Sequence, residues 1–110
     1  MAQLDFNSLL DNMVNAAQGS LASNWPAIKS LATTSLKTLA HNLVEIEEMN
    51  IGGTITPDQA SLLLDMQKHA LKMVLLSEEG LGLLAAEAAI NAVLDAIKVV
   101  VNSALGFPLI

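Results

Sequence analysis

Hydrophobic residues recur at helical spacing along most of the chain, and glycine and proline interrupt this pattern at a few points. The apolar positions of residues 4–17 predict a first helix, which ends at Gly19 or continues to about Ala22. A second apolar series runs from Ile28 to Met49 behind the start signal "SNWP", and it predicts a second helix. The periodicity therefore predicts an all-α fold.

The segment "NIGGTITPDQ" contains the clearest interruption of the helical pattern. Gly52 and Gly53 predict the end of the second helix, because glycine readily adopts the left-handed conformation that follows a helix. Thr56, Pro57 and Gln59 predict a new start, with Thr56 as the N-cap and Gln59 as its capping-box partner. A short link between two long helices predicts an antiparallel helical hairpin.

Two arrangements are open for the chain beyond this hairpin link. In one, "LLSEEGLG" ends a helix near Leu76 and a further helix meets it at Gly80. In the other, one very long C-terminal helix of about 70 Å continues through Gly80, because the polar residues keep a single helical phase. Gly106 predicts the end of the last helix, so the sequence predicts a hairpin or bundle of three to four helices. The polar residues in phase are Asp58, Ser61, Asp65, Lys68, Lys72, Glu79, Glu87, Asn91, Asp95, Lys98 and Asn102.

The segment 83–105 is apolar on nearly every side, with a polar line only one residue wide. A surface helix exposes about half of its circumference, so this helix is expected to lie inside a bundle, to pack against copies of itself, or to enter a bilayer. We expect packing between copies, with Ala86→Arg or Ala89→Arg breaking assembly and Glu87→Gln changing little. The predicted oligomer interface comprises Leu83, Ala86, Ala89, Ile90, Val93, Ile97 and Val100.

Membrane insertion of this segment is the first alternative. Glu87, Asp95 and Lys98 each cost about 2.5–3.5 kcal/mol at the centre of a bilayer, which disfavours a single spanning helix. A ring of such helices with the polar line facing a pore stays open, because intramembrane charges usually face a lumen. A membrane-active, holin-like pore former is therefore kept as an alternative function.

The composition favours association between copies of the chain. The 110 residues fit a single helical domain over 1–110. Hydrophobic residues make up 53% of the chain and charged residues 15%, against about 25% charged in typical soluble domains. A monomer of this size is expected to lack interior for so many apolar side chains, which predicts a homo-oligomer. The methionines inside the helices, Met13, Met49, Met66 and Met73, are expected to fill the core.

Charge and residue usage exclude several classes of function. The net charge is −6 and the chain has no arginine, which excludes a nucleic-acid-binding protein of the usual basic kind. There is no cysteine, so disulfides and thiolate sites are excluded. The segment "MAQLDFNSLLDNM" lacks the basic start of a secretion signal and predicts a cytoplasmic protein.

Two histidine–carboxylate pairs suggest the second alternative, a metal-binding bundle. His41 and Glu45 are one helical turn apart, as are Asp65 and His69, and the predicted hairpin brings the two pairs level. The same residues also suit ion pairs on a solvated face, which we favour because the Glu-x-x-His step of di-iron bundles is missing. No nucleophile elbow, phosphate-binding loop or zinc-protease helix occurs, so we expect a non-enzyme without a cofactor.

The last third of the chain, "LLSEEGLGLLAAEAAINAVLDAIKVVVNSALGFPLI", resembles small uncharacterised helical proteins encoded by tailed bacteriophages and prophages. The phrases "EGLG", "EAAINA" and "ALGF" carry the resemblance. It implies a viral context, in which small helical proteins often serve as virion or assembly components, and it brings no catalytic motif. Together the observations predict a non-enzymatic, self-assembling structural or interaction protein in the cytoplasm or in a phage virion.

Overall fold

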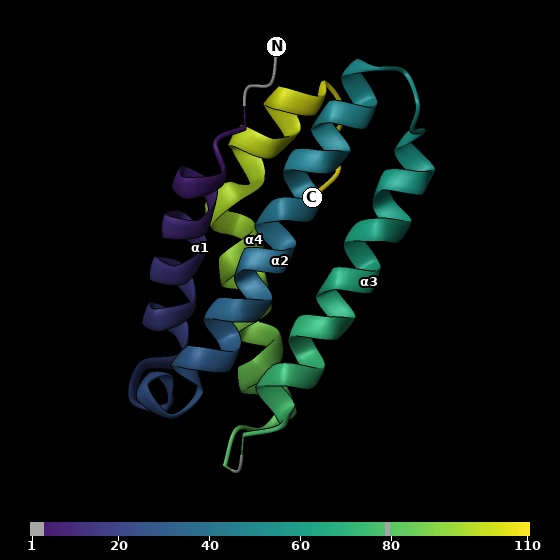
Figure 1. The fold of residues 1–110 in the computed structure, drawn as a ribbon. Helices are drawn as coiled ribbons and strands as arrows, with labels where there is room; N and C mark the ends of the chain where they lie inside the picture. The colour runs from purple at the N-terminus through teal and green to yellow at the C-terminus, as the bar shows by residue number, and fades with distance from the viewer. Residues whose placement is uncertain (1–3, 79) are drawn as a thin grey trace.

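The computed structural model describes residues 4–78 and 80–110, and these form an up-down-up-down bundle (Figure 1). All the regular structure in these residues is helical, which confirms the predicted all-α bundle. The elements are α1 (Phe6–Leu21), a 3-10 turn η1 (Ala22–Asn24), α2 (Trp25–Ile51), α3 (Pro57–Leu76) and α4 (Leu83–Leu105).

A side-chain cap starts α1 at Asp5. Its Oδ2 accepts hydrogen bonds from the Ser8 hydroxyl at 2.8 Å and from the Ser8 N–H at 3.3 Å. The bond from the Ser8 side chain holds the pKa of Asp5 below its usual value, because the bond favours the charged carboxylate. The helix continues through Gly19 to Leu21, so the longer of the two predicted lengths is correct.

The hairpin between α2 and α3 forms as predicted from its glycines and its cap. Gly53 follows α2 with φ of +71°, a conformation that glycine adopts without strain. At the start of α3, the Gln59 N–H donates to Thr56 Oγ1 at 3.1 Å, and the Thr56 N–H donates to Gln59 Oε1 at 2.9 Å. This reciprocal capping box satisfies two N–H groups that lack helical partners.

The single long C-terminal helix does not form, because the chain reverses between Leu76 and Leu83. The Ser77 hydroxyl donates to the Val74 carbonyl at 2.6 Å, which helps to close the end of α3. Gly80 has φ of +92°, so glycine supplies the left-handed residue of the turn. Residue 79 lies outside the described residues.

One chain buries a continuous core without help from a second copy. Its accessible surface is 6052 Å², close to the ~5,800 Å² that a compact monomer of 11.6 kDa has by the usual scaling. A single chain therefore has interior space for many of its apolar side chains, and the homo-oligomer stays a prediction. The large side chains with almost no exposed surface include Met13, Ile28, Leu36, Leu39, Leu43, Ile46, Leu75, Val93, Ile97 and Val101.

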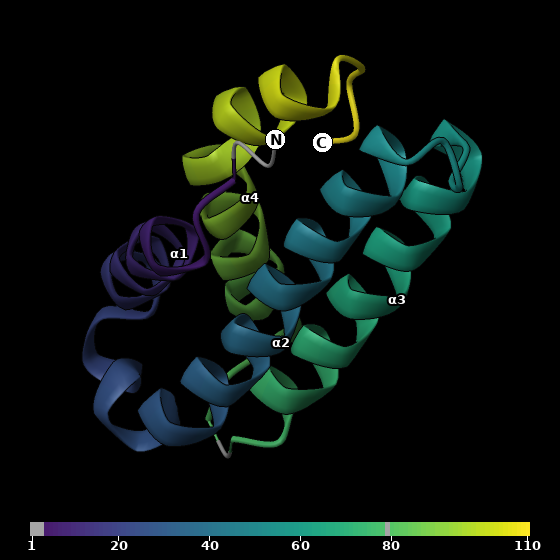
Figure 2. The same cartoon turned by 45° about the horizontal axis from the view of Figure 1, so that its top comes forward.

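The four helices differ in how fully they are surrounded. Helices α1 and α3 lie on opposite sides of the bundle, with α2 and α4 between them (Figures 1 and 2). Helix α1 packs closely on α4, whereas α3 packs mainly on α2 and more sparsely on α4. The α3–α4 side of the bundle is therefore the more open one.

The residues after α4 fold back on the bundle. Gly106 ends α4 in the left-handed conformation, with φ of +80°, as the sequence predicts. Asn102 Oδ1 then accepts hydrogen bonds from the N–H groups of Leu109 at 2.9 Å and Ile110 at 3.0 Å. These bonds hold the apolar side chains of Leu109 and Ile110 against the core.

Candidate functional site

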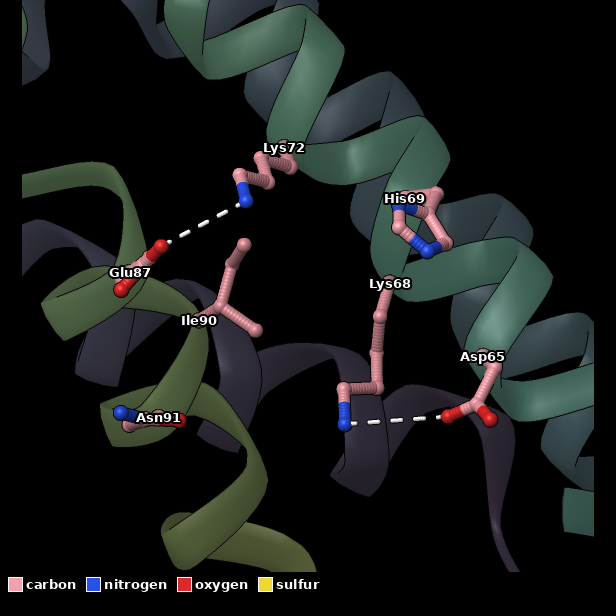
Figure 3. Close-up of a pocket in the computed structure, with 7 residues that line it drawn as sticks. All are labelled: Asp65, Lys68, His69, Lys72, Glu87, Ile90 and Asn91. Carbon is pink, nitrogen blue, oxygen red and sulfur yellow. Dashed lines mark hydrogen bonds and ion pairs between the residues drawn. The ribbon is translucent and has the colours of Figure 1, made fainter. Parts of the chain in front are cut away.

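The polar line recognised in the sequence borders a groove between α3 and α4 (Figure 3). Because the two helices are antiparallel neighbours, each places its polar residues on the side that faces the other. A single helical phase along the sequence therefore does not require a continuous helix. The residues of the line that border the groove are Ser61, Asp65, Lys68, Lys72, Glu87, Asn91, Asp95 and Lys98.

Charged side chains that line this groove form two ion pairs. Lys72 Nζ lies 3.4 Å from Glu87 Oε1 and joins α3 to α4, and Lys68 Nζ lies 3.9 Å from Asp65 Oδ1 within α3 (Figure 3). The groove consists of two adjoining hollows of about 400 and 490 Å³ that open to solvent. Exposed ion pairs contribute about 0–1 kcal/mol each, so the groove has the properties of a solvated face.

The four metal-ligand candidates do not come together. His41 stacks on Phe6 of α1, with ring centroids 4.2 Å apart, whereas Asp65 and His69 border the α3–α4 groove. All four side chains, including that of Glu45, are exposed. Among residues 4–78 and 80–110, no group of three or more histidine, aspartate or glutamate side chains is placed to hold a metal ion.

A buried carboxylate at Glu47 was missed by the sequence reasoning. Its side chain is fully buried, and its Oε1 accepts a hydrogen bond from the Leu4 N–H at 3.0 Å. The bond ties the chain before α1 to α2. The signal was present in the sequence, because Glu47 is in helical phase with the buried residues Leu36, Ala40 and Leu43.

Most of the predicted oligomer interface lies in the core of the single chain. Five of its residues are buried within one chain: Ala86, Ala89, Ile90, Val93 and Ile97. Only Leu83 and Val100 stay exposed. The small side chains of α4 permit close approach as expected, but the helix that approaches them is α1 of the same chain.

A series of exposed, mostly apolar side chains lies along α3. We call Leu62, Met66, His69, Met73 and Leu76 the α3 stripe, because their spacing of four, three, four and three residues places them on one face. Leu62, Met66 and Met73 are 62%, 57% and 69% exposed. The buried residues of α3, Ala60, Leu64, Leu71 and Leu75, occupy the opposite face.

The α3 stripe corrects the expectation that the methionines fill the core. Met13 is fully buried and Met49 is half-buried against the core, but Met66 and Met73 face solvent. Helix α4 also exposes four large apolar side chains, but these lie in two pairs near its opposite ends: Leu83 with Leu84, and Val99 with Val100. Among the described residues, only on α3 are the exposed large apolar side chains spread along the length of one helix face.

Comparison with known protein families, curated proteins and solved structures finds no match in any of the three. The resemblance to phage-encoded proteins stays a prediction from the sequence. Within the described part of the chain, no helix is both long and apolar enough to cross a membrane.

Proposed function

We propose that this chain is a non-enzymatic helical interaction protein that self-assembles through the α3 stripe. The observation that carries the proposal is that α3 has two opposite apolar faces, of which the bundle buries only one. A helix at the edge of a bundle needs a single apolar face for folding. The outer face therefore has no role in the fold of one chain.

The energetics of the stripe favour a protein partner over solvent. Burying a leucine or methionine side chain completely contributes about 1.5–3 kcal/mol, and three such side chains on α3 are more than half exposed. Methionine also adapts its shape to a partner surface, because its side chain is unbranched and flexible. A second copy of the chain offers a stripe of the same length and character.

The dimer is expected to be reversible. Association costs translational and rotational freedom, and a short helix face offsets this cost only in part. The bundle keeps its own core without the partner, so monomer and dimer both stay folded. As part of the same proposal, a phage virion or assembly intermediate is a setting in which such contacts between copies recur.

Light scattering after size exclusion tests the proposal at roughly 0.1 mM chain, which is above the micromolar affinities of small interfaces. The matched variants are Met66→Arg/Met73→Arg, which charges the stripe, and Leu84→Arg, which charges an exposed leucine of α4 that is 83% exposed. We expect wild type and Leu84→Arg at a multiple of 11.6 kDa and the stripe variant at 11.6 kDa.

Circular dichroism of the same samples shows whether each variant keeps its helices. A stripe variant with wild-type helix content and the mass of a monomer supports the proposal. A wild-type chain that is monomeric at this concentration overturns it, as does a stripe variant that keeps the wild-type mass.

A further inference from the structure

The spacing of the α3 stripe carries an inference about how two copies meet, and it rests on the proposed function. Steps of four, three, four and three residues make a straight seam along a helix, as in the core positions of a coiled coil. We propose that α3 packs against α3 of a second copy in the antiparallel direction, about a twofold axis between Met66 and His69.

This register matches every stripe residue from Leu62 to Met73 with a stripe residue of the second copy. Antiparallel packing about that axis places Leu62 level with Met73 of the second copy, and Met66 level with His69 of the second copy. The twofold axis repeats both pairs, so each copy uses the same surface and the contact closes as a dimer. Leu76 then lies at the margin of the seam, in keeping with its smaller exposure.

Charge selects the antiparallel direction. Asp65 and Lys72 lie on one flank of the stripe, one residue before Met66 and Met73 respectively. In the antiparallel register Asp65 faces Lys72 of the second copy, and the twofold axis repeats this ion pair. In a parallel pair the same flank faces Ala70 and Ser77 of the second copy, which carry no charge.

The flanking charges are free to exchange partners. Asp65 pairs within its own chain with Lys68 at 3.9 Å, and Lys72 pairs with Glu87 at 3.4 Å. The side chains of Asp65 and Lys72 are 59% and 32% exposed, so both ion pairs are solvated and weak. Figure 3 shows Lys72 directed to Glu87 and Asp65 paired with Lys68, so the proposed dimer exchanges these partners for residues of the second copy.

The opposite flank of the stripe permits close approach. Ala70 lies there, exposed and small, and Leu63 of the same flank is half-buried against the core. In the antiparallel register Leu63 lies near Ala70 of the second copy. One flank thus adds two ion pairs to the dimer and the other adds apolar contact.

Disulfide trapping tests the direction of pairing, because the chain has no cysteine of its own. Leu62→Cys and Met73→Cys are each made alone, then oxidised separately and as an equal mixture. In the antiparallel register, residue 62 of the two copies is separated by about 16 Å along the helix axis, from the rise of 1.5 Å per residue. Disulfides require Cα atoms within about 7 Å.

We therefore expect the mixture to form the mixed disulfide dimer and each variant alone to form little. Leu84→Cys mixed with Met73→Cys is the control for random collision. Efficient self-linking of Leu62→Cys alone overturns the antiparallel register and supports parallel pairing. Equal linking in all samples, including the control, also overturns it.

Charge reversal tests the flank independently. Asp65→Lys and Lys72→Asp each place like charges opposite each other in their own homodimers, whereas a mixture of the two restores both ion pairs in a heterodimer. We expect each variant alone to dimerise about tenfold more weakly than wild type, and the mixture to recover most of that loss. Lys68→Asp is the control. It removes the ion pair between Lys68 and Asp65 within the chain, but residue 68 does not face the second copy in this register.

The outcomes separate this inference from the proposed function. If wild type dimerises, the stripe variant does not, and the charge mixture shows no recovery, the stripe is the interface but the register is wrong. If wild type is monomeric, the proposed function itself fails. The register is supported if Asp65→Lys mixed with Lys72→Asp recovers dimerisation and Asp65→Lys mixed with Lys68→Asp does not.

Discussion

Helices α3 and α4 contrast in what they do with their apolar side chains. Helix α4 is the more apolar of the two, but it lies between neighbours and places most of its large side chains inside the chain. Helix α3 carries more polar residues, yet it lies at the edge of the bundle and leaves the stripe uncovered. The number of apolar residues in a helix therefore does not locate an interface, because position in the bundle decides which of them stay exposed.

The largest difference in unfolding free energy is expected between an arginine on the buried side of α4 and an arginine on the α3 stripe. Ala89→Arg puts an unpaired charge at a fully buried position and is expected to cost about 3–5 kcal/mol, enough to abolish most of the fold. Met73→Arg faces solvent and is expected to change the unfolding free energy by about 0.5 kcal/mol or less.

Urea unfolding at low chain concentration measures both variants without a contribution from dimerisation. From the sequence, Ala86→Arg or Ala89→Arg was expected to break assembly. Because both alanines lie in the core of the single chain, we now expect these substitutions to unfold the chain itself. If the Ala89→Arg chain were folded and monomeric, the result would support the oligomer interface on α4 that the sequence predicts.

The next effect compares the two faces of α3. Leu71→Ala removes a buried side chain of the inner face and is expected to cost about 2–4 kcal/mol. Leu62→Ala removes a stripe side chain and is expected to leave the monomer within about 0.5 kcal/mol of wild type, while it weakens the dimer. Urea unfolding and light scattering of both variants measure the contrast, and similar losses of stability at both positions would contradict it.

The smallest differences in unfolding free energy are expected for substitutions at the N-caps of α3 and α4. Thr56→Ala removes the capping box of α3 and is expected to lower the unfolding free energy by about 1 kcal/mol. Gly82 starts α4 without a side-chain cap, with φ of −83° and open space around it. Gly82→Ser is expected to raise the unfolding free energy by a few tenths of a kcal/mol. Thermal unfolding measures both, and a stabilising Thr56→Ala would contradict the capping argument.

Local signals made much of the fold predictable from sequence. Gly53, Thr56 and Gly106 act through the backbone conformation and hydrogen bonds of their own segment, so their effects needed no knowledge of distant residues. The break at Gly80 was undecided because a glycine fits both a turn and a helix interior. The cost of a glycine within a helix, about 1 kcal/mol, is small beside the tertiary packing that each arrangement offers.

The candidate site was less predictable, because burial depends on which helices meet. Ala86 and Ala85 have the same side chain, yet one is buried in the core and the other is exposed. Met66 and Met73 look like core residues in the sequence, and only the position of α3 at the edge of the bundle shows that they face solvent. Glu47 is polar yet buried, and the Leu4 N–H before α1 donates a hydrogen bond to its side chain.

Methionine methyl NMR over a dilution series tests most directly whether the α3 stripe joins two copies. Met66 and Met73 report on the stripe, and the fully buried Met13 reports on the core of the same chain. We expect the Met66 and Met73 signals to shift together with concentration, with one dissociation constant, while the Met13 signal stays constant. Constant stripe signals up to roughly 1 mM chain, beyond the affinity range of specific interfaces, would contradict the account.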